Sequence, residues 1–520
     1  MIQNDDQDEH YRPDEFVSTL ETTRDAITAS MLYNYVQCPH RVYLDLYGDS
    51  NDKDEESSFV ELLWERGNAF EAEVIRNLGF PYTDLSHLRG DEKEEATMRS
   101  MHRGDECIYS GRIRHGNLLG EPDILRRSGA GYVAGDIKSG SGDEGSGGDE
   151  EGRLKTHYAV QLSLYTDILE RHGLSPIKRP FVWDVHGREV PYPLDAAAGI
   201  RERKSLWAVY RDVLKEVEAI QDGRTLTRPA YASPCRLCHW KSFCRKTLEG
   251  MRDLTLVPEL GRSKRERILH VARTFDDLAR LDPGSLIQGR KSLITGIGAE
   301  SIRKFILRSR LLATQGASPV LTGDLDLPES QTEVFFDLET DPMRDICYLH
   351  GFLVRKKNTS GETYVGFFAD TPTHGDEEAA FLRAWSYIRS LQPCTIYIYS
   401  KYERTVWRRL QKRYPAVVSF HEVEDLFSSN QCVDLLSDAV KSKTEWPTYD
   451  HSIKTLATYL GFTWRDTDPS GASSIQWYHR WVETQDPSLK KRILEYNEDD
   501  CIATRILLDA LRRLQAKGRV

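Results

Sequence analysis

Apolar positions along the chain follow two periods, which together predict a mixed α/β protein. Helical spacing is found in Phe59–Leu78, where Trp64 belongs to the apolar stripe, in His157–Arg171 and in Leu489–Leu514. Two short apolar runs instead have the pattern of buried strands, namely Tyr132–Lys138 and Glu333–Glu339. The polar residues at the end of each run lie two positions apart, which places them on one face of a strand. No repeat of solenoid or propeller length occurs.

Shifts in composition divide the chain into five segments. These are an acidic flexible leader, an α/β region, a short basic helical segment, a linker rich in Pro, Gly, Ser and Asp, and a second α/β region, at residues 1–27, 28–250, 254–312, 313–332 and 333–520. Within the first α/β region, SGSGDEGSGGDEEG at 139–152 predicts a flexible acidic loop.

The composition excludes several classes of protein. With 39% apolar and 29% charged residues, the chain is neither collagen-like nor wholly disordered. It lacks an apolar run long enough for a membrane helix, and its start lacks the basic and apolar regions of a secretory signal. Nine cysteines spread thinly over 520 residues favour a reducing compartment. We therefore expect a cytoplasmic protein without a membrane partner.

The net charge of −11 is unevenly distributed. Residues 1–60 hold 14 acidic and 4 basic side chains, a balance of −10, so the rest of the chain is nearly neutral. Residues 255–312 hold 12 basic and 6 acidic side chains, a local balance of +6. Because a binding face responds to its local field, the overall charge does not exclude a nucleic-acid partner.

Four cysteines have the spacing of metal ligands. Cys235, Cys238 and Cys244 lie close together after Pro234, and Cys38 lies in Tyr-Val-Gln-Cys-Pro-His almost two hundred residues upstream. Four such thiolates suit a [4Fe–4S] cluster or zinc, and a singlet plus a triplet is less typical of zinc. The alternative is four unrelated buried thiols. We expect the other five cysteines to be packing residues.

Two short predicted strands carry a first set of candidate catalytic residues. Asp136 and Lys138 share one face of their strand, and Asp123 in Glu-Pro-Asp-Ile-Leu can meet them from a neighbouring strand. Two carboxylates can hold Mg²⁺ or Mn²⁺, while a lysine can orient a water molecule. Glu71, on the upstream helix, is a candidate third carboxylate. Gln161 and Tyr165 share a face of the downstream helix and are further candidates.

The basic segment contains a glycine turn before a helix. Gly296 and Gly298 lie in the turn, and Arg303 and Lys304 follow in the helix. Turn amides and a helix N-terminus bind anions, so the segment predicts a helix-hairpin-helix module that contacts phosphates without reading sequence. The alternative is an ordinary helical linker with glycine caps.

A second acidic set joins distant parts of the last region. Asp337 and Glu339 end an apolar strand, whereas Tyr496 and Asp500 lie four residues apart on the apolar face of the last helix. A carboxylate on such a face requires compensation, and metal coordination provides it. Glu403, at a strand-to-helix junction, is a third candidate. We expect Asp434 to be structural, and Asp499 lies off the helix face that carries Tyr496.

The first set, in this order with the cysteine triplet, resembles the iron–sulphur RecB-like nucleases of the PD-(D/E)XK superfamily, which include the CRISPR adaptation nucleases. The resemblance implies metal-dependent DNA cleavage, with Asp123 and Asp136 as metal ligands, Lys138 positioning water, and Gln161 and Tyr165 contacting the strand. It also implies a [4Fe–4S] cluster on the four cysteines. Many members have a histidine where this chain has Glu71.

The second set resembles the RNase H-like DEDD exonucleases whose last motif is Tyr-x3-Asp. This resemblance makes Asp337, Glu339 and Asp500 ligands of two Mg²⁺ ions and Tyr496 the residue that orients the attacking water. It implies a 3′–5′ exonuclease. The middle motif departs from the family, because its usual aspartate appears as Glu403, so an inactive domain is the alternative.

The order of domains is similar to that of a bacterial and archaeal family of RecB-like nucleases, which also occurs fused to superfamily 1 helicases. Ile475-Gln-Trp-Tyr-His-Arg-Trp-Val and Tyr496-Asn-Glu-Asp-Asp-Cys carry this resemblance. The chain has no Gly-x4-Gly-Lys-[Ser/Thr] motor motif, so a separate helicase is a candidate partner. We expect a two-site nuclease acting on DNA single strands or ends. A non-catalytic nucleic-acid-binding scaffold and an RNA-processing enzyme are the rivals.

Overall fold

The computed structural model describes residues 26–518 except 145–151, 176, 200, 201, 358 and 360. Contacts divide the chain into two compact units, of which the first contains Met1–Val42 and Val74–Thr225 and the second Tyr43–Glu73 and Leu226–Val520. Most of the predicted leader and the centre of the predicted acidic loop lie outside the described residues. Among the described helices, none combines the length and the apolar character needed to cross a bilayer.

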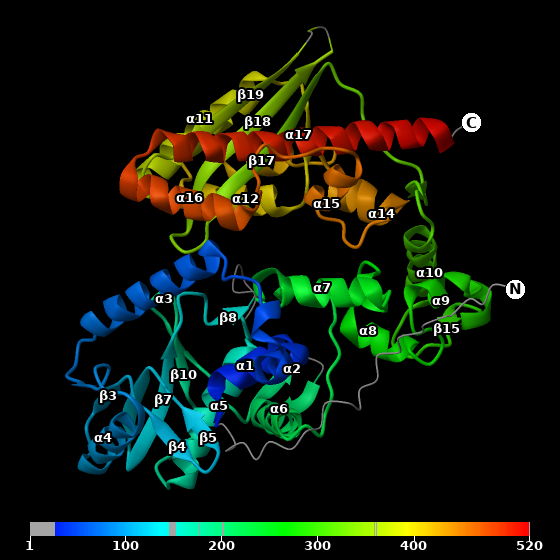
Figure 1. The fold of residues 1–520 in the computed structure, drawn as a ribbon. Helices are drawn as coiled ribbons and strands as arrows, with labels where there is room; N and C mark the ends of the chain where they lie inside the picture. The colour runs from blue at the N-terminus through cyan, green and yellow to red at the C-terminus, as the bar shows by residue number, and fades with distance from the viewer. Residues whose placement is uncertain are drawn as a thin grey trace, which may run out of the picture. The chain divides into compact units, whose positions relative to one another are not determined.

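A six-stranded sheet with the order β11-β10-β7-β6-β3-β2 forms the centre of the first unit (Figure 1). Its fully buried strand β7 (Gly131–Ile137) pairs antiparallel with β6 (Ile124–Ser128) and parallel with β10 (Phe181–Trp183). Helix α5 (Thr156–Arg171) packs against β7, and ten of its residues are buried. A β-turn-β unit followed by a buried helix therefore places the first candidate site.

Smaller elements complete this unit. They are β1 (Ile27–Thr28), α1 (Ala29–Gln37), β2 (Thr83–Asp84), α4 (Gly90–Arg103), β3 (Cys107–Tyr109), β4 (Ile113–His115), β5 (Leu118–Gly120), β8 (Asp143–Glu144), β9 (Arg153–Leu154), β11 (Glu189–Pro191), β12 (Ala197–Gly199), β13 (Glu202–Ser205) and α6 (Leu206–Gln221). Helices α2 (Pro39–Tyr47) and α3 (Ser58–Arg76) each include residues of both units. Residues 143–144 of the predicted acidic loop form β8, which pairs with β9 directly after the loop.

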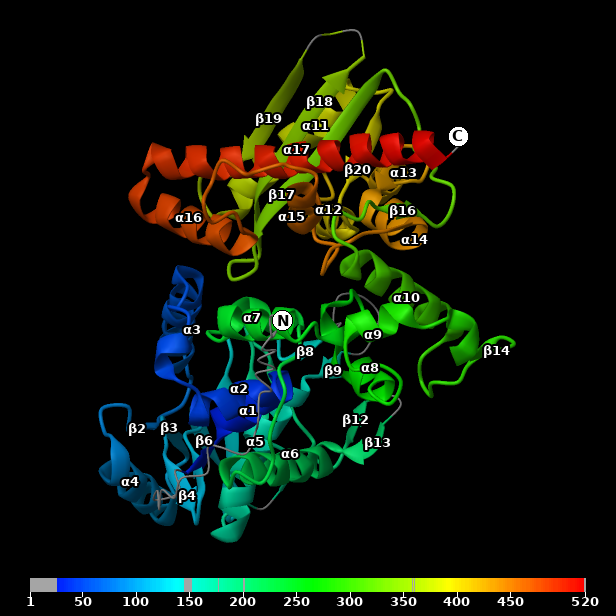
Figure 2. The same cartoon turned by 45° about the vertical axis from the view of Figure 1, so that its right-hand side comes forward.

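The second unit begins its longer part with a small helical module (Figure 2). Its elements are η3 (Ser233–Leu237), α7 (Lys241–Gly250), η4 (Leu254–Leu256), α8 (Gly261–Ile268), α9 (Phe275–Arg280), η5 (Pro283–Leu286), β14 (Ile287–Gln288), β15 (Lys291–Ser292) and α10 (Ala299–Ala313). Leu248 of α7 is buried in the same hydrophobic cluster as Leu254 and Phe305. The end of α7 therefore belongs to this module.

A five-stranded sheet with the order β19-β18-β17-β20-β21 dominates the rest of the second unit. β17 (Thr332–Asp341), β18 (Ile346–Lys356) and β19 (Glu362–Phe368) are antiparallel neighbours, whereas β20 (Thr395–Ile398) and β21 (Cys432–Asp434) run parallel to β17. The other elements are η2 (Ser50–Asp52), β16 (Val320–Leu321), α11 (His374–Ser390), α12 (Tyr402–Arg413), α13 (Phe420–Leu426), η6 (Leu435–Val440), α14 (Lys441–Lys443), β22 (Thr444–Glu445), α15 (Ile453–Tyr459), α16 (Gly471–Thr484) and α17 (Pro487–Gly518).

Alternation along β17 assigns its side chains to two layers. Val334 and Phe336 pack with Trp385 of α11, whereas Phe335 packs with Leu507 of α17. Helix α17 therefore covers the sheet face that carries the odd-numbered residues of β17, and Figure 1 shows it crossing that face. Asp337 and Glu339 have the same parity as Phe335, so the fold directs them toward α17.

Three details of the structure bear on the predicted organisation. By contacts, residues 226–250 group with the second unit, and Leu248 of α7 shares the core of the helical module. The predicted linker 313–332 contains β16, and its Leu325 is 6% exposed in the core under α17. Trp64, which belongs to the apolar stripe of Phe59–Leu78, is 57% exposed.

Candidate functional site

Three carboxylates meet where β17 faces α17. Ligand oxygens of Asp337, Glu339 and Asp500 all lie within 4.8 Å of one another. The strand places the first two on one face, and the helix presents Asp500 one turn after Tyr496. The structure therefore brings together four of the residues predicted for this site.

The electrostatics of this site favour a bound cation. Burial, followed by the charges of Asp500 and Glu339, raises the pKa of Asp337 well above its ordinary value. Burial and the charge of Asp500 raise the pKa of Glu339 to about 8. Hard carboxylate oxygens held at this spacing fit Mg²⁺ or Mn²⁺, because a divalent ion relieves the repulsion between them.

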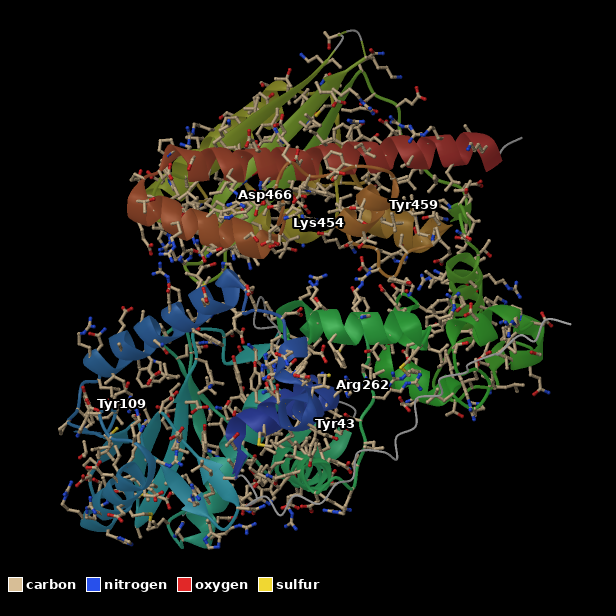
Figure 3. The ribbon with its side chains drawn as sticks, viewed as in Figure 1. Tyr43, Tyr109, Arg262, Lys454, Tyr459 and Asp466 are labelled. Carbon is tan, nitrogen blue, oxygen red and sulfur yellow. The ribbon has the colours of Figure 1, made fainter. Side chains whose placement is uncertain are left out.

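Tyr496 is buried beside the carboxylates. Lys454 on α15 donates a hydrogen bond of 2.9 Å to its hydroxyl and lies 3.1 Å from Oδ1 of Asp500. Burial and the charge of Asp500 raise the pKa of Tyr496 well above its ordinary value, so the hydroxyl keeps its proton. Figure 3 labels Lys454 where α15, α16 and α17 come together.

Sequence reasoning missed three residues of this site. Besides Lys454, Asn497 donates a hydrogen bond of 2.6 Å to Asp337, and the indole of Trp464 donates one of 2.8 Å to Asp500. Asn497 lies inside the Tyr-Asn-Glu-Asp-Asp run, so its proximity to Tyr496 was a usable signal. Lys454 and Trp464 have no comparable signal, because each reaches the site through tertiary packing.

Glu403 lies outside the set of three carboxylates. Its side chain is 4% exposed on α12, and burial and the charge of Asp434 raise its pKa to about 8. One carboxylate oxygen of each of these two residues is buried without a hydrogen-bond partner among the described residues. Asp434 also accepts a hydrogen bond from the amide of Ser437, and Asp499 accepts one from the guanidinium of Arg465.

The first unit brings Asp123, Asp136 and Lys138 together at the open end of the β6–β7 hairpin, opposite its turn. Asp136 is 2% exposed, and its Oδ2 lies 3.0 Å from Nζ of Lys138. Asp123 accepts a hydrogen bond of 2.7 Å from the amide of Ile137. Burial lowers the pKa of Lys138, but the charges of Asp136 and Asp123 outweigh it and raise that pKa above its ordinary value. The lysine is therefore a fixed cation beside two acids.

Gln161 and Tyr165 are joined on α5, as their spacing predicts. The Gln161 amide donates a hydrogen bond of 3.1 Å to the Tyr165 hydroxyl, which points to the carbonyl of Glu121 at 3.4 Å. The ring of Tyr165 belongs to the hydrophobic core and is 2% exposed, whereas Gln161 is half-buried. Glu71 lies on α3, in the part of that helix that groups with the second unit.

The four candidate ligand cysteines differ from the others in burial. Cys38 follows α1, Cys235 lies in η3, Cys238 follows η3 and Cys244 lies in α7. All four are half-buried, whereas the remaining cysteines are buried, namely Cys107, Cys347, Cys394, Cys432 and Cys501. Burial of the second group agrees with the packing role expected for it.

The glycine turn of the helical module has a defined geometry. Gly296 has a φ of 75°, and a Cβ there would collide with the guanidinium of Arg267, which donates to the carbonyl of Thr295. Gly298 is the N-cap of α10. On that helix the Arg303 side chain is 53% exposed, whereas Lys304 donates to the carbonyl of Lys441.

Comparisons with protein families agree with this architecture. Residues 40–245 match the model of the PD-(D/E)XK nuclease superfamily, and residues 334–512 match that of the RNase H superfamily. These matches confirm the predicted fold class and the predicted pair of nuclease-superfamily domains. A search of curated proteins found no match to the chain.

Proposed function

Because residues 40–245 belong to the PD-(D/E)XK nuclease superfamily and residues 334–512 to the RNase H superfamily, we propose that the protein is a metal-dependent nuclease with two sites. Its substrate is DNA, as single strands or ends. The C-terminal site is a 3′–5′ exonuclease. Since the chain carries no helicase motor motif, we include a separate helicase as the partner that supplies single strands.

The observation that carries the proposal is the group of Asp337, Glu339 and Asp500 beside Tyr496. A bound Mg²⁺ or Mn²⁺ supplies Lewis acidity and an activated water. The three carboxylates hold the ion, and Asn497 keeps Asp337 oriented toward it. The protonated Tyr496 hydroxyl donates to the attacking water and so aligns it with the phosphorus atom.

At the first site the same chemistry uses a different set of groups. Asp123 and Asp136 are the proposed metal ligands, with Glu71 as a third. Lys138, already a cation beside both aspartates, orients water and offsets charge on the phosphate. Gln161 on α5 is the proposed contact to the nucleic-acid strand. The Tyr165 hydroxyl accepts a hydrogen bond from the Gln161 side-chain amide and so holds that amide in place.

We propose that Cys38, Cys235, Cys238 and Cys244 hold a [4Fe–4S] cluster. Their half-buried position suits ligands better than packing residues, which are buried elsewhere in this chain. The cluster is a structural staple in this proposal and takes no part in cleavage. The turn at Gly296 and Gly298, with Arg303 and Lys304, is the proposed phosphate contact of the helical module.

A pair of variants tests the proposal. Asp136→Ala and Asp337→Ala are assayed separately with Mn²⁺ on labelled single-stranded DNA and on RNA of the same sequence. We expect each variant to lose one of two DNA cleavage patterns and keep the other. Cleavage of RNA that is stronger than cleavage of the DNA would show that the protein is an RNA-processing enzyme. If neither substitution lowers cleavage, the protein is a nucleic-acid-binding scaffold instead.

A further inference from the structure

A lysine contacts one carboxylate of the proposed metal site, since Nζ of Lys454 lies 3.1 Å from Oδ1 of Asp500. We propose that Lys454 is the resident cation of this site: it holds Asp500 and the Tyr496 hydroxyl in place, and it releases Asp500 when a divalent ion binds. Lys454 is thus a positioning residue that sets how tightly the site binds metal. The inference rests on the proposed metal-dependent function of the Asp337, Glu339 and Asp500 group.

The contacts of Lys454 occupy the atoms that a metal would need. Its Nζ lies 3.1 Å from Oδ1 and 3.5 Å from Oδ2 of Asp500. Oδ1 also accepts the indole N–H of Trp464 at 2.8 Å. A metal that binds Asp500 must therefore compete with the ammonium for the same carboxylate. Two positive centres this close repel each other, so the lysine weakens metal binding.

Two aromatic rings also flank the ammonium where it contacts Asp500. Nζ lies 5.0 Å from the centre of the Trp464 ring and 4.6 Å from that of the Tyr496 ring. The Lys454 side chain is 32% exposed, and its four-carbon stem is flexible. Attraction to the two rings and the contact with the Tyr496 hydroxyl do not depend on Asp500, so both continue to stabilise the ammonium when its contact with Asp500 is broken. If a metal ion displaces the Lys454 ammonium from Asp500, the ammonium is therefore not left as an uncompensated buried charge.

Other contacts of charged groups near the site, among the described residues, involve acids outside the group of Asp337, Glu339 and Asp500. Arg465 pairs with Asp499 and Glu498, and Asp341 lies at hydrogen-bond distance, 2.7 Å, from Nε2 of His479. Lys454, in contrast, directs its ammonium at a carboxylate of the metal-binding group. Its charge is also the one that opposes the raised pKa values of Asp337 and Glu339. The geometry thus singles out Lys454 as the group whose removal alters metal affinity.

The test measures metal binding without nucleic acid. Mn²⁺ is titrated calorimetrically into full-length protein carrying Asp136→Asn, which removes a ligand of the first site. The same protein with Asp337→Asn added defines the binding that belongs to the second site. We expect Lys454→Met to tighten Asp337-dependent Mn²⁺ binding roughly tenfold. At saturating Mn²⁺, it should slow Asp337-dependent cleavage, because Tyr496 loses its hydrogen-bond donor.

Matched variants separate charge from packing. Lys490 lies near the Phe368 and Trp481 rings and pairs with Asp370, and its side chain is 31% exposed. Lys490→Met should leave Mn²⁺ affinity unchanged, as should Lys454→Arg, which retains the charge. Lys454→Gln, which retains a donor without the charge, should tighten binding as Lys454→Met does.

Each outcome decides a different claim. Equal or weaker Mn²⁺ binding by both neutral variants of Lys454 overturns the inference and leaves the nuclease proposal intact. Absence of any Asp337-dependent Mn²⁺ binding in the Asp136→Asn protein overturns both. Tighter binding by Lys490→Met would show that the effect is not specific to this lysine.

Discussion

The side-chain amide of Asn497 donates a hydrogen bond of 2.6 Å to Asp337, which lies 160 residues earlier in the chain. The Asn497 carbonyl oxygen in turn accepts the Tyr364 hydroxyl at 2.8 Å. Gly351, opposite Asp337 in the register of β17 and β18, leaves room for this arrangement, since a Cβ there would lie 1.6 Å from the Asn497 oxygen. One carboxylate of the site is thus oriented from helix and sheet together.

Asn497→Ala should lower Asp337-dependent cleavage by about 10- to 100-fold, because groups that orient metal ligands have effects of this size. Gly351→Ala should act in the same direction by displacing the Asn497 side chain. Cleavage rates on single-stranded DNA, measured with the first site inactivated by Asp136→Ala, check both. Gln161→Ala is the control and should leave this activity unchanged. Wild-type cleavage rates for both variants would show that Asp337 does not need the hydrogen bond from Asn497.

Glu403→Gln should change how stability depends on pH. Burial and Asp434 raise the folded-state pKa of Glu403 from 4.5 to about 8. Below pH 4.5 the carboxyl is neutral in both states; between pH 4.5 and 8 the unfolded chain ionises more readily, so this carboxyl costs stability increasingly as pH rises. At pH 8 the variant should be more stable than wild type by about 1–3 kcal/mol.

Thermal unfolding at pH 5 and pH 8, without added divalent ions, measures this difference. The stabilisation should be smaller at pH 5. A variant that is less stable than wild type at pH 8 would show that Glu403 is ionised and compensated in the folded protein.

Arg308 and Glu445 join the helical module to the sheet domain through a buried ion pair, with side chains 1% and 0% exposed. Arg308→Met should destabilise the second unit by about 3–5 kcal/mol, because it leaves the Glu445 charge buried and unpaired. Arg308→Met with Glu445→Leu should recover most of the loss. Calorimetric unfolding measures these changes. Arg310→Met, on the exposed side of α10, is the control; an equal loss there would refute the role of the pair.

The cysteine proposal predicts a specific metal content. Protein purified without oxygen should contain iron and sulphide and be coloured, and Cys244→Ser should lose both, because a cluster ligand is removed. Cys394→Ser should retain them, since Cys394 is a buried packing residue. Metal analysis of the three proteins checks this. Zinc without iron in the wild-type protein would show that the four cysteines form a zinc site and not an iron–sulphur cluster.

Local periodicity predicted the parts of the fold that depend on nearby residues. The last helix, expected at Leu489–Leu514, extends over Pro487–Gly518, and the strand beginning at Glu333 corresponds to β17. Spacing of two on a strand and four on a helix was sufficient to place Asp337 with Glu339 and Tyr496 with Asp500. That these two pairs lie close to each other was predicted only by the resemblance to the DEDD exonucleases, because no local pattern indicates it.

Tertiary relationships were beyond the sequence. Lys454 reaches Asp500 across 46 residues, and nothing in Ile453–Tyr459 marks it as different from any lysine at the start of a helix. The exposure of Trp64 shows the same limit, because helical spacing identifies a stripe but not what covers it. Leu325 was assigned to a linker on composition, although α17 buries it.

The proposed role of the β17 and α17 carboxylates is to hold the metal that cleaves nucleic acid from its 3′ end. The most direct measurement follows 5′-labelled single-stranded DNA incubated with Mn²⁺ and full-length protein in which Asp136→Ala inactivates the first site. We predict a ladder of fragments that shortens progressively from the 3′ end and disappears when Asp337→Asn is added. Cleavage that is unaffected by Asp337→Asn, or no cleavage at all, would contradict the account.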